Sequence, residues 1–169
     1  VISEIHFHPL SGDDRDEFVE LHNRGSNSVD LGGWRFVDGI DLELPAGTTI
    51  APGAFLAVSR DAAHFRATHP GLPAAAVVGD FEGNLSDRGE RLELARPIAD
   101  QDHPDPLWIT VAEAQYRDGT PASRWADGGG SSLERLDLRS DPMNPDHWVD
   151  SDETGKADWV LIETTGLLE

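Results

Sequence analysis

An acidic run near the end of the sequence has the residue types and spacing of a calcium-binding loop. Residues 150–155 read Asp-Ser-Asp-Glu-Thr-Gly, with acids or a hydroxyl at alternate positions and a glycine at the sixth. Calcium is bound by about six oxygens, and alternate side chains of such a loop point toward the ion. The predicted ligands are Asp150, Asp152, Thr154 and Asp158, with a backbone carbonyl and water. Because Leu161 stands where such loops carry a bidentate Glu, the alternative is an acidic loop that faces solvent.

Three aromatic residues could form a ligand surface, because flat apolar rings stack on sugars while polar neighbours fix the orientation. These residues are Trp125, Trp108 and Tyr116. The alternative is that they fill the core, as we expect for Trp34 and Trp148. Trp125 lies close to a glycine-rich stretch, and we expect it to be the most exposed of the set.

Three histidines suggest a second metal site. His6 and His8 are two residues apart, so both rings would project from the same face of a strand. With His22 on a neighbouring strand they could hold zinc or copper. The alternative is a structural role, in which His8 hydrogen-bonds to a loop.

The patterns that identify common hydrolases are missing from the sequence. It contains no Gly-x-Ser-x-Gly elbow and no His-Glu-x-x-His pair. Residues 128–132 read Gly-Gly-Gly-Ser-Ser and lack the lysine of a phosphate-binding loop, so they indicate a flexible turn. Without cysteine there is no thiolate nucleophile and no cysteine-based zinc site. We therefore predict no catalytic residues and a protein that is not an enzyme.

The charge of the chain restricts its partners. With 32 acidic and 13 basic residues the formal net charge is −19, and such a field repels nucleic acid and anionic membrane surfaces. The sequence has no apolar run long enough to insert into a membrane. We expect no nucleic-acid partner and no membrane insertion.

Short strands must position all of these residues. Seventeen Gly and eleven Pro separate short apolar runs, as is typical of an all-β fold with many turns. Val19 and Leu21 alternate with polar neighbours as one face of a strand, and we expect a second strand over 29–36, joined by a turn at 23–28. Further strands are expected at 2–7, 40–44, 48–50, 55–58, 75–78, 89–95, 107–116 and 132–138, with hairpin-like turns at 38–39 and 51–53. One short helix should begin after Asp61 and end before Pro70.

Several short motifs, in this order and spacing, resemble the lamin tail domain. They are residues 2–5 with His8-Pro9, residues 17–21 with Asn23, residues 31–34, 45–48, 51–53 and 85–87 with Gly89, then Tyr116, Trp125, residues 132–134, and Asn144 with Trp148. That family is an immunoglobulin-like sandwich found in nuclear lamins and in many bacterial surface and secreted proteins. The resemblance implies an all-β, immunoglobulin-like antiparallel β-sandwich with one short helix, and it supplies no catalytic residues.

The resemblance spans residues 1–150, which we expect to form one domain. Residues 151–169 would then hold a closing strand at Trp159–Ile162 or the start of a following module, and the last two residues could be a cloning scar.

The resulting functional hypothesis is a non-catalytic interaction or spacer module of a larger exported bacterial protein. We expect it to be monomeric, to lie outside the cell or at its surface, and to bind a protein or a polysaccharide there. The alternative is a carbohydrate-binding module attached to a hydrolase. No cofactor is expected apart from the calcium ion discussed above.

Overall fold

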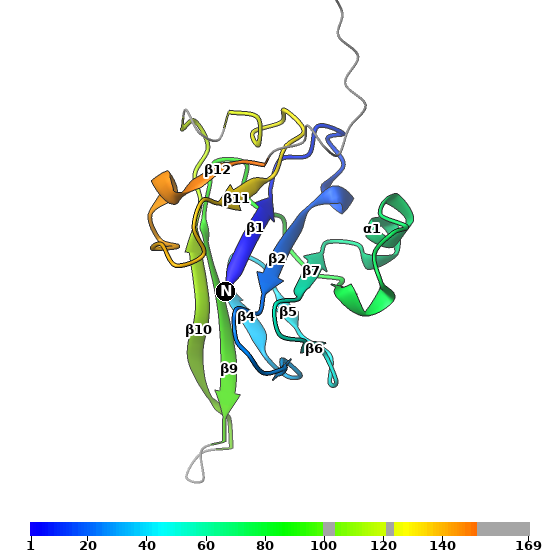
Figure 1. Ribbon diagram of the computed structural model, residues 1–169, viewed down its shortest axis with the longest axis vertical. Helices are drawn as coiled ribbons and strands as arrows, with labels where there is room; N and C mark the ends of the chain where they lie inside the picture. The colour runs from blue at the N-terminus through cyan, green and yellow to red at the C-terminus, as the bar shows by residue number, and fades with distance from the viewer. Residues whose placement is uncertain (100–103, 121–123, 152–169) are drawn as a thin grey trace, which may run out of the picture.

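The computed structural model describes residues 1–99, 104–120 and 124–151, and these fold mainly as β-strands joined by turns (Figure 1). The strands are β1 (Ile2–His6), β2 (Phe18–His22), β3 (Val29–Asp30), β4 (Arg35–Asp38), β5 (Leu42–Glu43), β6 (Thr49–Ile50), β7 (Phe55–Ser59), β8 (Val77–Val78), β9 (Arg91–Ile98), β10 (Leu107–Gln115), β11 (Leu133–Arg135) and β12 (Trp148–Asp150). Short 3-10 turns lie at Asp14–Asp16, Ala74–Ala76 and Pro145–His147, and the α-helix α1 spans Ala62–Thr68.

The larger sheet is built around β1. Its strand order is β12-β11-β1-β2-β7-β8, and all of its pairings are antiparallel except β7 with β8. Val19 and Leu21 are buried while Phe18, Glu20 and His22 are only partly buried, so the alternation predicted for this strand is confirmed.

The smaller sheet has the order β10-β9-β4-β5, and β3 pairs with β6 as a separate ribbon. Gly39, with φ of 87°, makes the turn between β4 and β5. Residues of both sheets, such as Ile5 and Val19 from one and Leu92 and Leu94 from the other, belong to a single buried cluster. The fold is thus the expected all-β, immunoglobulin-like sandwich with one short helix.

The expected pairing of the strands at 17–22 and 29–36 is wrong. β2 pairs with β1 and β7, whereas β3 pairs with β6, and β4 with β5 and β9. The connecting residues carry the chain from one sheet to the other. The Asn23 side-chain amide donates to Asn27 O at 2.8 Å and to Ile50 O at 2.9 Å, so it ties the connection after β2 to β6. The turn at 51–53 likewise joins strands of different sheets, β6 and β7.

The helix follows the sequence prediction. The Asp61 carboxylate accepts a hydrogen bond from His64 N at 2.8 Å, which caps the helix. Phe65 packs against Phe18, with ring centroids 5.2 Å apart. The helix therefore covers the part of the larger sheet that faces away from the main core, on the right of Figure 1.

Two acids, the buried Glu17 and the partly buried Glu90, hold the loop between β8 and β9. The Leu85 N–H donates to Glu17 Oε2 at 3.0 Å, and the Ser86 N–H donates to Glu90 Oε1 at 2.8 Å. The Tyr116 hydroxyl lies 2.9 Å from the same Glu90 oxygen. Burial raises the pKa of Glu17 to about 7 and also raises that of Glu90, because a charged carboxylate loses hydration inside the protein.

The two tryptophans expected in the core differ in their burial. Trp148 is fully buried, as predicted, whereas Trp34 is only partly buried and packs against the edge of the core.

We expect Trp34→Ala to lower the free energy of unfolding by about 2 kcal/mol, less than the roughly 3 to 5 kcal/mol typical of a fully buried aromatic residue. Urea denaturation measures this loss. Trp125→Ala, at an exposed position, is the control and should leave the midpoint nearly unchanged. If Trp34→Ala lowered the free energy of unfolding by at least as much as Trp148→Ala, the placement of Trp34 at the edge of the core would be wrong.

Candidate interaction surface

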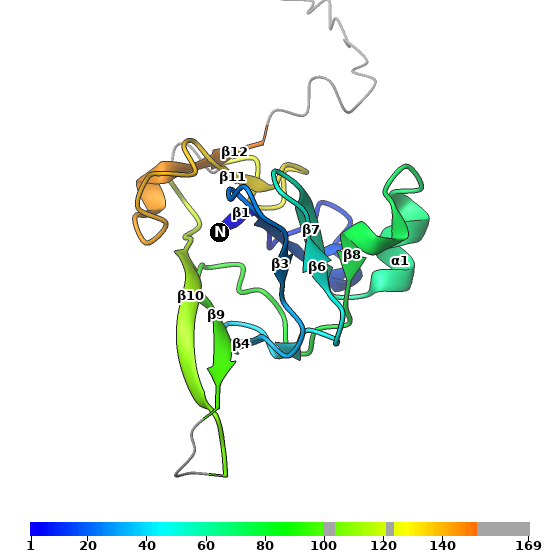
Figure 2. The same cartoon turned by 60° about the horizontal axis from the view of Figure 1, so that its bottom comes forward.

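Strands β9 and β10 form a long antiparallel ribbon that extends beyond the rest of the sandwich (Figures 1 and 2). The two strands pair from Leu107 with Ile98 to Gln115 with Arg91, with an irregularity in register between Thr110 and Ala112. Charged and aromatic contacts hold the ribbon to its neighbour β4. Arg91 lies 2.6 Å from Glu93, 2.9 Å from Glu113 and 3.2 Å from Asp38, and these carboxylates, Glu113 first, raise its pKa.

The outer edge of β10 is open. It is the last strand of its sheet, and within the described residues its one backbone hydrogen bond to a segment other than β9 runs from Gln115 N to Pro142 O at 2.9 Å. Leu107, Ile109 and Val111 are 58%, 44% and 38% exposed. Residues 107–112 contain no charge, although natural edge strands usually carry charges that discourage pairing with other chains. The edge therefore combines unpaired backbone groups with three exposed apolar side chains, of which Val111 lies at the register irregularity.

The predicted aromatic ligand surface is not assembled. Tyr116 is fully buried, and its hydroxyl lies 3.0 Å from Ser86 O, so its assignment to a ligand surface is wrong. It follows Ala114 on the inward face at the end of β10, which is why it belongs to the core. Trp108 is partly buried, with the Arg35 guanidinium 4.9 Å from its ring. Trp125 is 60% exposed, as expected, on the loop before β11.

The calcium prediction falls mostly outside the described residues. Asp152, Thr154 and Asp158 all lie beyond residue 151. The carboxylate of Asp150 is described, and it accepts hydrogen bonds from the backbone N–H of Trp125 at 2.9 Å and of Ala126 at 2.7 Å. Asp150 thus anchors the loop that carries Trp125, and calcium binding stays a prediction.

The three histidines have separate surroundings. His8 Nδ1 lies 2.7 Å from Asp127 Oδ1, and this hydrogen bond raises the pKa of His8. His22 Nδ1 lies 3.1 Å from Ala54 O, while the His6 ring packs against Phe18. Across residues 1–99, 104–120 and 124–151, no three His, Asp or Glu side chains gather in a way that could hold a metal ion. His8 thus makes a hydrogen bond to a loop, as expected if its role is structural and it is not a metal ligand.

A group of arginines was not identified from the sequence. Arg24, Arg135 and Arg139 line neighbouring hollows beside β10. They are distant in the sequence, and only the pairing of β1 with both β2 and β11 brings their segments together. No local motif could have indicated this group.

The comparisons with known proteins agree with the fold. The family model for the Lamin Tail Domain matches residues 1–101. No curated protein and no solved structure matches the chain. In the part of the chain that the structure describes, no helix has the length and apolar character needed to cross a membrane. Strands β10 to β12 lie beyond the matched residues, yet they complete the same two sheets. The chain belongs to the lamin tail domain family.

Proposed function

We propose that this domain is a non-catalytic interaction module of a larger exported bacterial protein, and that it binds an extended segment of a protein partner along the outer edge of β10. The observation that carries the proposal is the open, uncharged edge of this strand. Its family, a non-catalytic immunoglobulin-like one, supports a binding role over a catalytic one. An extracellular or cell-surface location is part of the proposal.

The geometry of the edge favours an extended polypeptide as the occupant. A strand added to a sheet edge satisfies the unpaired N–H and C=O groups through main-chain hydrogen bonds, while side chains alternate between the two faces. Leu107, Ile109 and Val111 are exposed and offer apolar contacts to side chains of the added strand. At about 25 cal/mol for each Å² of apolar surface removed from water, covering these side chains adds affinity to the main-chain bonds.

The carbohydrate-binding alternative depends on Trp125. Of the three residues predicted for the aromatic surface, Trp125 is the one whose side chain is exposed. The Arg124 guanidinium lies 5.9 Å from the centre of its ring. No second aromatic among the described residues stacks beside Trp125, and a single ring gives a weaker argument than the open strand edge. Loss of binding to an immobilised glycan array in Trp125→Ala would favour this alternative.

The edge is tested with a displayed library of random twelve-residue peptides selected on the wild-type domain. We expect Ile109→Lys to weaken binding of the selected peptides at least tenfold, about 1.4 kcal/mol, because a lysine on an edge strand opposes strand addition. Isothermal titration calorimetry with a synthetic selected peptide measures the effect.

The matched control is Leu72→Lys, which places the same charge at a similarly exposed apolar position after α1. It should bind as wild type does. Selected peptides that bind Ile109→Lys and wild type equally, or a library from which none is enriched, would overturn the proposal.

A further inference from the structure

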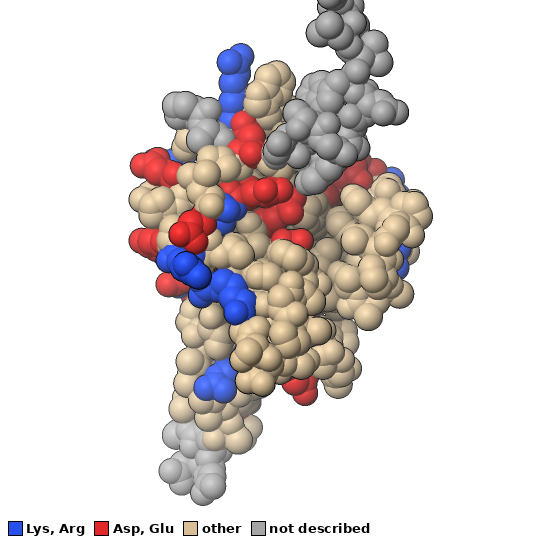
Figure 3. Space-filling model, viewed as in Figure 1, with Lys and Arg blue, Asp and Glu red and all other residues tan. Residues whose placement is uncertain are grey.

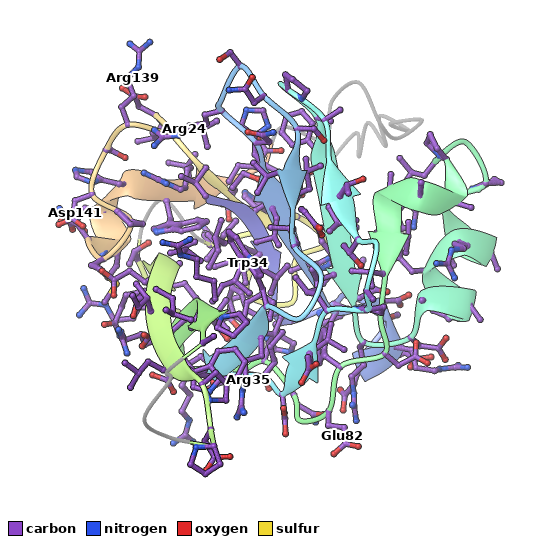
Figure 4. All side chains as sticks on the ribbon, turned by 90° about the horizontal axis from the view of Figure 1, so that it is seen from below. Arg24, Trp34, Arg35, Glu82, Arg139 and Asp141 are labelled. Atoms are coloured by element: carbon purple, nitrogen blue, oxygen red, sulfur yellow. The ribbon has the colours of Figure 1, made fainter. Side chains whose placement is uncertain are left out.

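A hollow lined by arginines lies directly beside the open edge of β10. It has a volume of about 360 Å³, and its walls include Arg24, Arg135, Arg139 and residues 110–113 of β10. A second hollow of about 820 Å³ shares the same three arginines. We call the smaller hollow, the one that borders β10, the arginine hollow. Arginine atoms, drawn blue, gather on the left of the space-filling view in Figure 3, and Figure 4 shows Arg24 and Arg139 at the same corner of the molecule.

The arginine hollow has acids nearby, since Asp137 and Asp141 act on the charge of Arg135, but its arginines make no direct ion pair within the described residues. In the described part of the chain, none of its three guanidinium groups has a carboxylate oxygen within 4.0 Å. Arg24 donates instead to Leu138 O, and Arg135 Nη2 donates to Ser140 O. By contrast, Arg91 on the neighbouring strand contacts three carboxylates. Other arginines of the described residues, such as Arg60 and Arg66, also donate to backbone carbonyls, so what distinguishes the three of the arginine hollow is that they line it together.

Arg135 makes the arrangement costly. Its side chain belongs to a residue only 8% exposed, and within the described residues its Nε–H is buried without an acceptor. Burial and the nearby charge of Arg24 lower the pKa of Arg135, and the charges of Asp137 and Asp141 oppose this effect. A buried cation without a direct ion pair and an unmade hydrogen bond both destabilise the domain. An anion bound beside Arg24 and Arg135 would reduce the repulsion between the two cations.

We propose that the arginine hollow binds an aspartate or glutamate side chain of the partner segment that adds to β10. This inference rests on the proposed function and names the chemistry of the partner. Guanidinium groups present paired N–H donors that match the two oxygens of a carboxylate. The acid would come from an extended peptide because one wall of the hollow is the strand edge itself, whose backbone groups pair with a peptide backbone.

An adjoining slot refines the partner chemistry. It has a volume of about 270 Å³, shares Arg24, Val111 and Ala112 with the arginine hollow, and is otherwise lined largely by apolar residues, including Trp34 and Leu31. A partner with an apolar residue close to its acid fits both spaces. The net charge of −19 repels such a peptide only over distances that salt screens, about 8 Å at physiological ionic strength.

The test compares a selected twelve-residue peptide with its analogue in which every Asp and Glu is replaced by Asn and Gln. On the wild-type domain we expect the amide analogue to bind at least tenfold more weakly by titration calorimetry. On Arg24→Gln and on Arg139→Gln this difference should shrink to less than threefold. Arg66→Gln removes the same charge from an exposed position on α1 and should keep the full difference. Arg135→Met is not used alone, because removing a buried arginine could unfold the domain.

The possible failures are distinguishable. If Ile109→Lys abolishes binding but the acid and amide peptides bind alike, the edge is a binding site and the arginine hollow has no role. If Ile109→Lys binds both peptides as wild type does, the proposed function fails as well.

A second measurement detects the hollow without a partner. In ¹⁵N NMR spectra, titration with sodium acetate should shift the Nε–H resonance of Arg135 in a saturable way, while sodium chloride of equal ionic strength should not. The internal control is the Nε–H of Arg91, because the Nη1 and Nη2 atoms of that guanidinium already contact carboxylates. Equal shifts with acetate and chloride would overturn the proposal.

Discussion

Trp148→Ala is expected to lower the free energy of unfolding by about 3 to 5 kcal/mol, the range for removing a large buried aromatic side chain. Trp148 is fully buried in the main core cluster, and its indole Nε1–H donates to Pro142 O at 3.1 Å. It also opens β12, the strand that closes one edge of the larger sheet. Its removal therefore leaves a cavity and a weakened outer strand, while Pro142 O keeps the hydrogen bond from Gln115 N.

Urea denaturation followed by circular dichroism measures this loss. Trp148→Phe is the partial control, because it keeps most of the apolar volume and loses the indole hydrogen bond, so it should cost about 1 to 2 kcal/mol. If Trp148→Ala had the same midpoint as Trp125→Ala, Trp148 would not be part of the core.

The contribution of Glu17 to stability is expected to decline as pH rises from about 4.5 to about 7. Burial raises its pKa from 4.5 to about 7 in the folded protein, with Asp14 contributing in the same direction and the Leu85 N–H opposing it. Between these two pH values the folded state binds the proton and the unfolded state has released it. Because the folded state holds more protons there, stability falls as pH increases. The maximum loss is on the order of 3 kcal/mol, from about 1.36 kcal/mol for each pKa unit.

Comparison with Glu17→Gln isolates this effect from the other acids. The variant keeps an oxygen that can accept from the Leu85 N–H and cannot ionise. We expect the two proteins to have similar unfolding free energies near pH 4.5, and the variant to be more stable at pH 8. Glu82→Gln is the control, because Glu82 is exposed and points away from the molecule in Figure 4. Asp13, whose pKa the Arg15 hydrogen bond lowers to about 2, titrates below this window. If the difference in unfolding free energy between Glu17→Gln and wild type stayed constant from pH 4.5 to 8, the pKa of Glu17 would not be raised by folding.

Local patterns in the sequence predicted the elements well because they depend on neighbouring residues. The alternation around Val19 and the capping of the helix by Asp61 are of this kind. Which strands pair depends on distant residues, and so the assumed hairpin after β2 was wrong. The Asn23 side chain bonds to residues in two different segments, which a reading of the turn alone does not show.

The candidate site was less predictable for the same reason. The open edge of β10 depends on its having no neighbour beyond β9 in the described sheet, a property of topology. One missed residue did have a pattern. Glu17 precedes Val19 and Leu21 at the same two-residue spacing, and all three are buried, so the alternation itself pointed Glu17 inward.

The central position of β1 has a consequence for how the chain acquires its fold. β1 is synthesised before the other described strands, yet one of its two neighbours is β11, so that Glu4 lies opposite Glu134. The larger sheet cannot close until nearly all of the described chain has left the ribosome, and bringing such distant segments together is slow because the intervening chain must lose its freedom first. Until then β1 has an exposed edge. A fragment that ends where the family match ends, at residue 101, would keep that edge permanently and would lack Trp148.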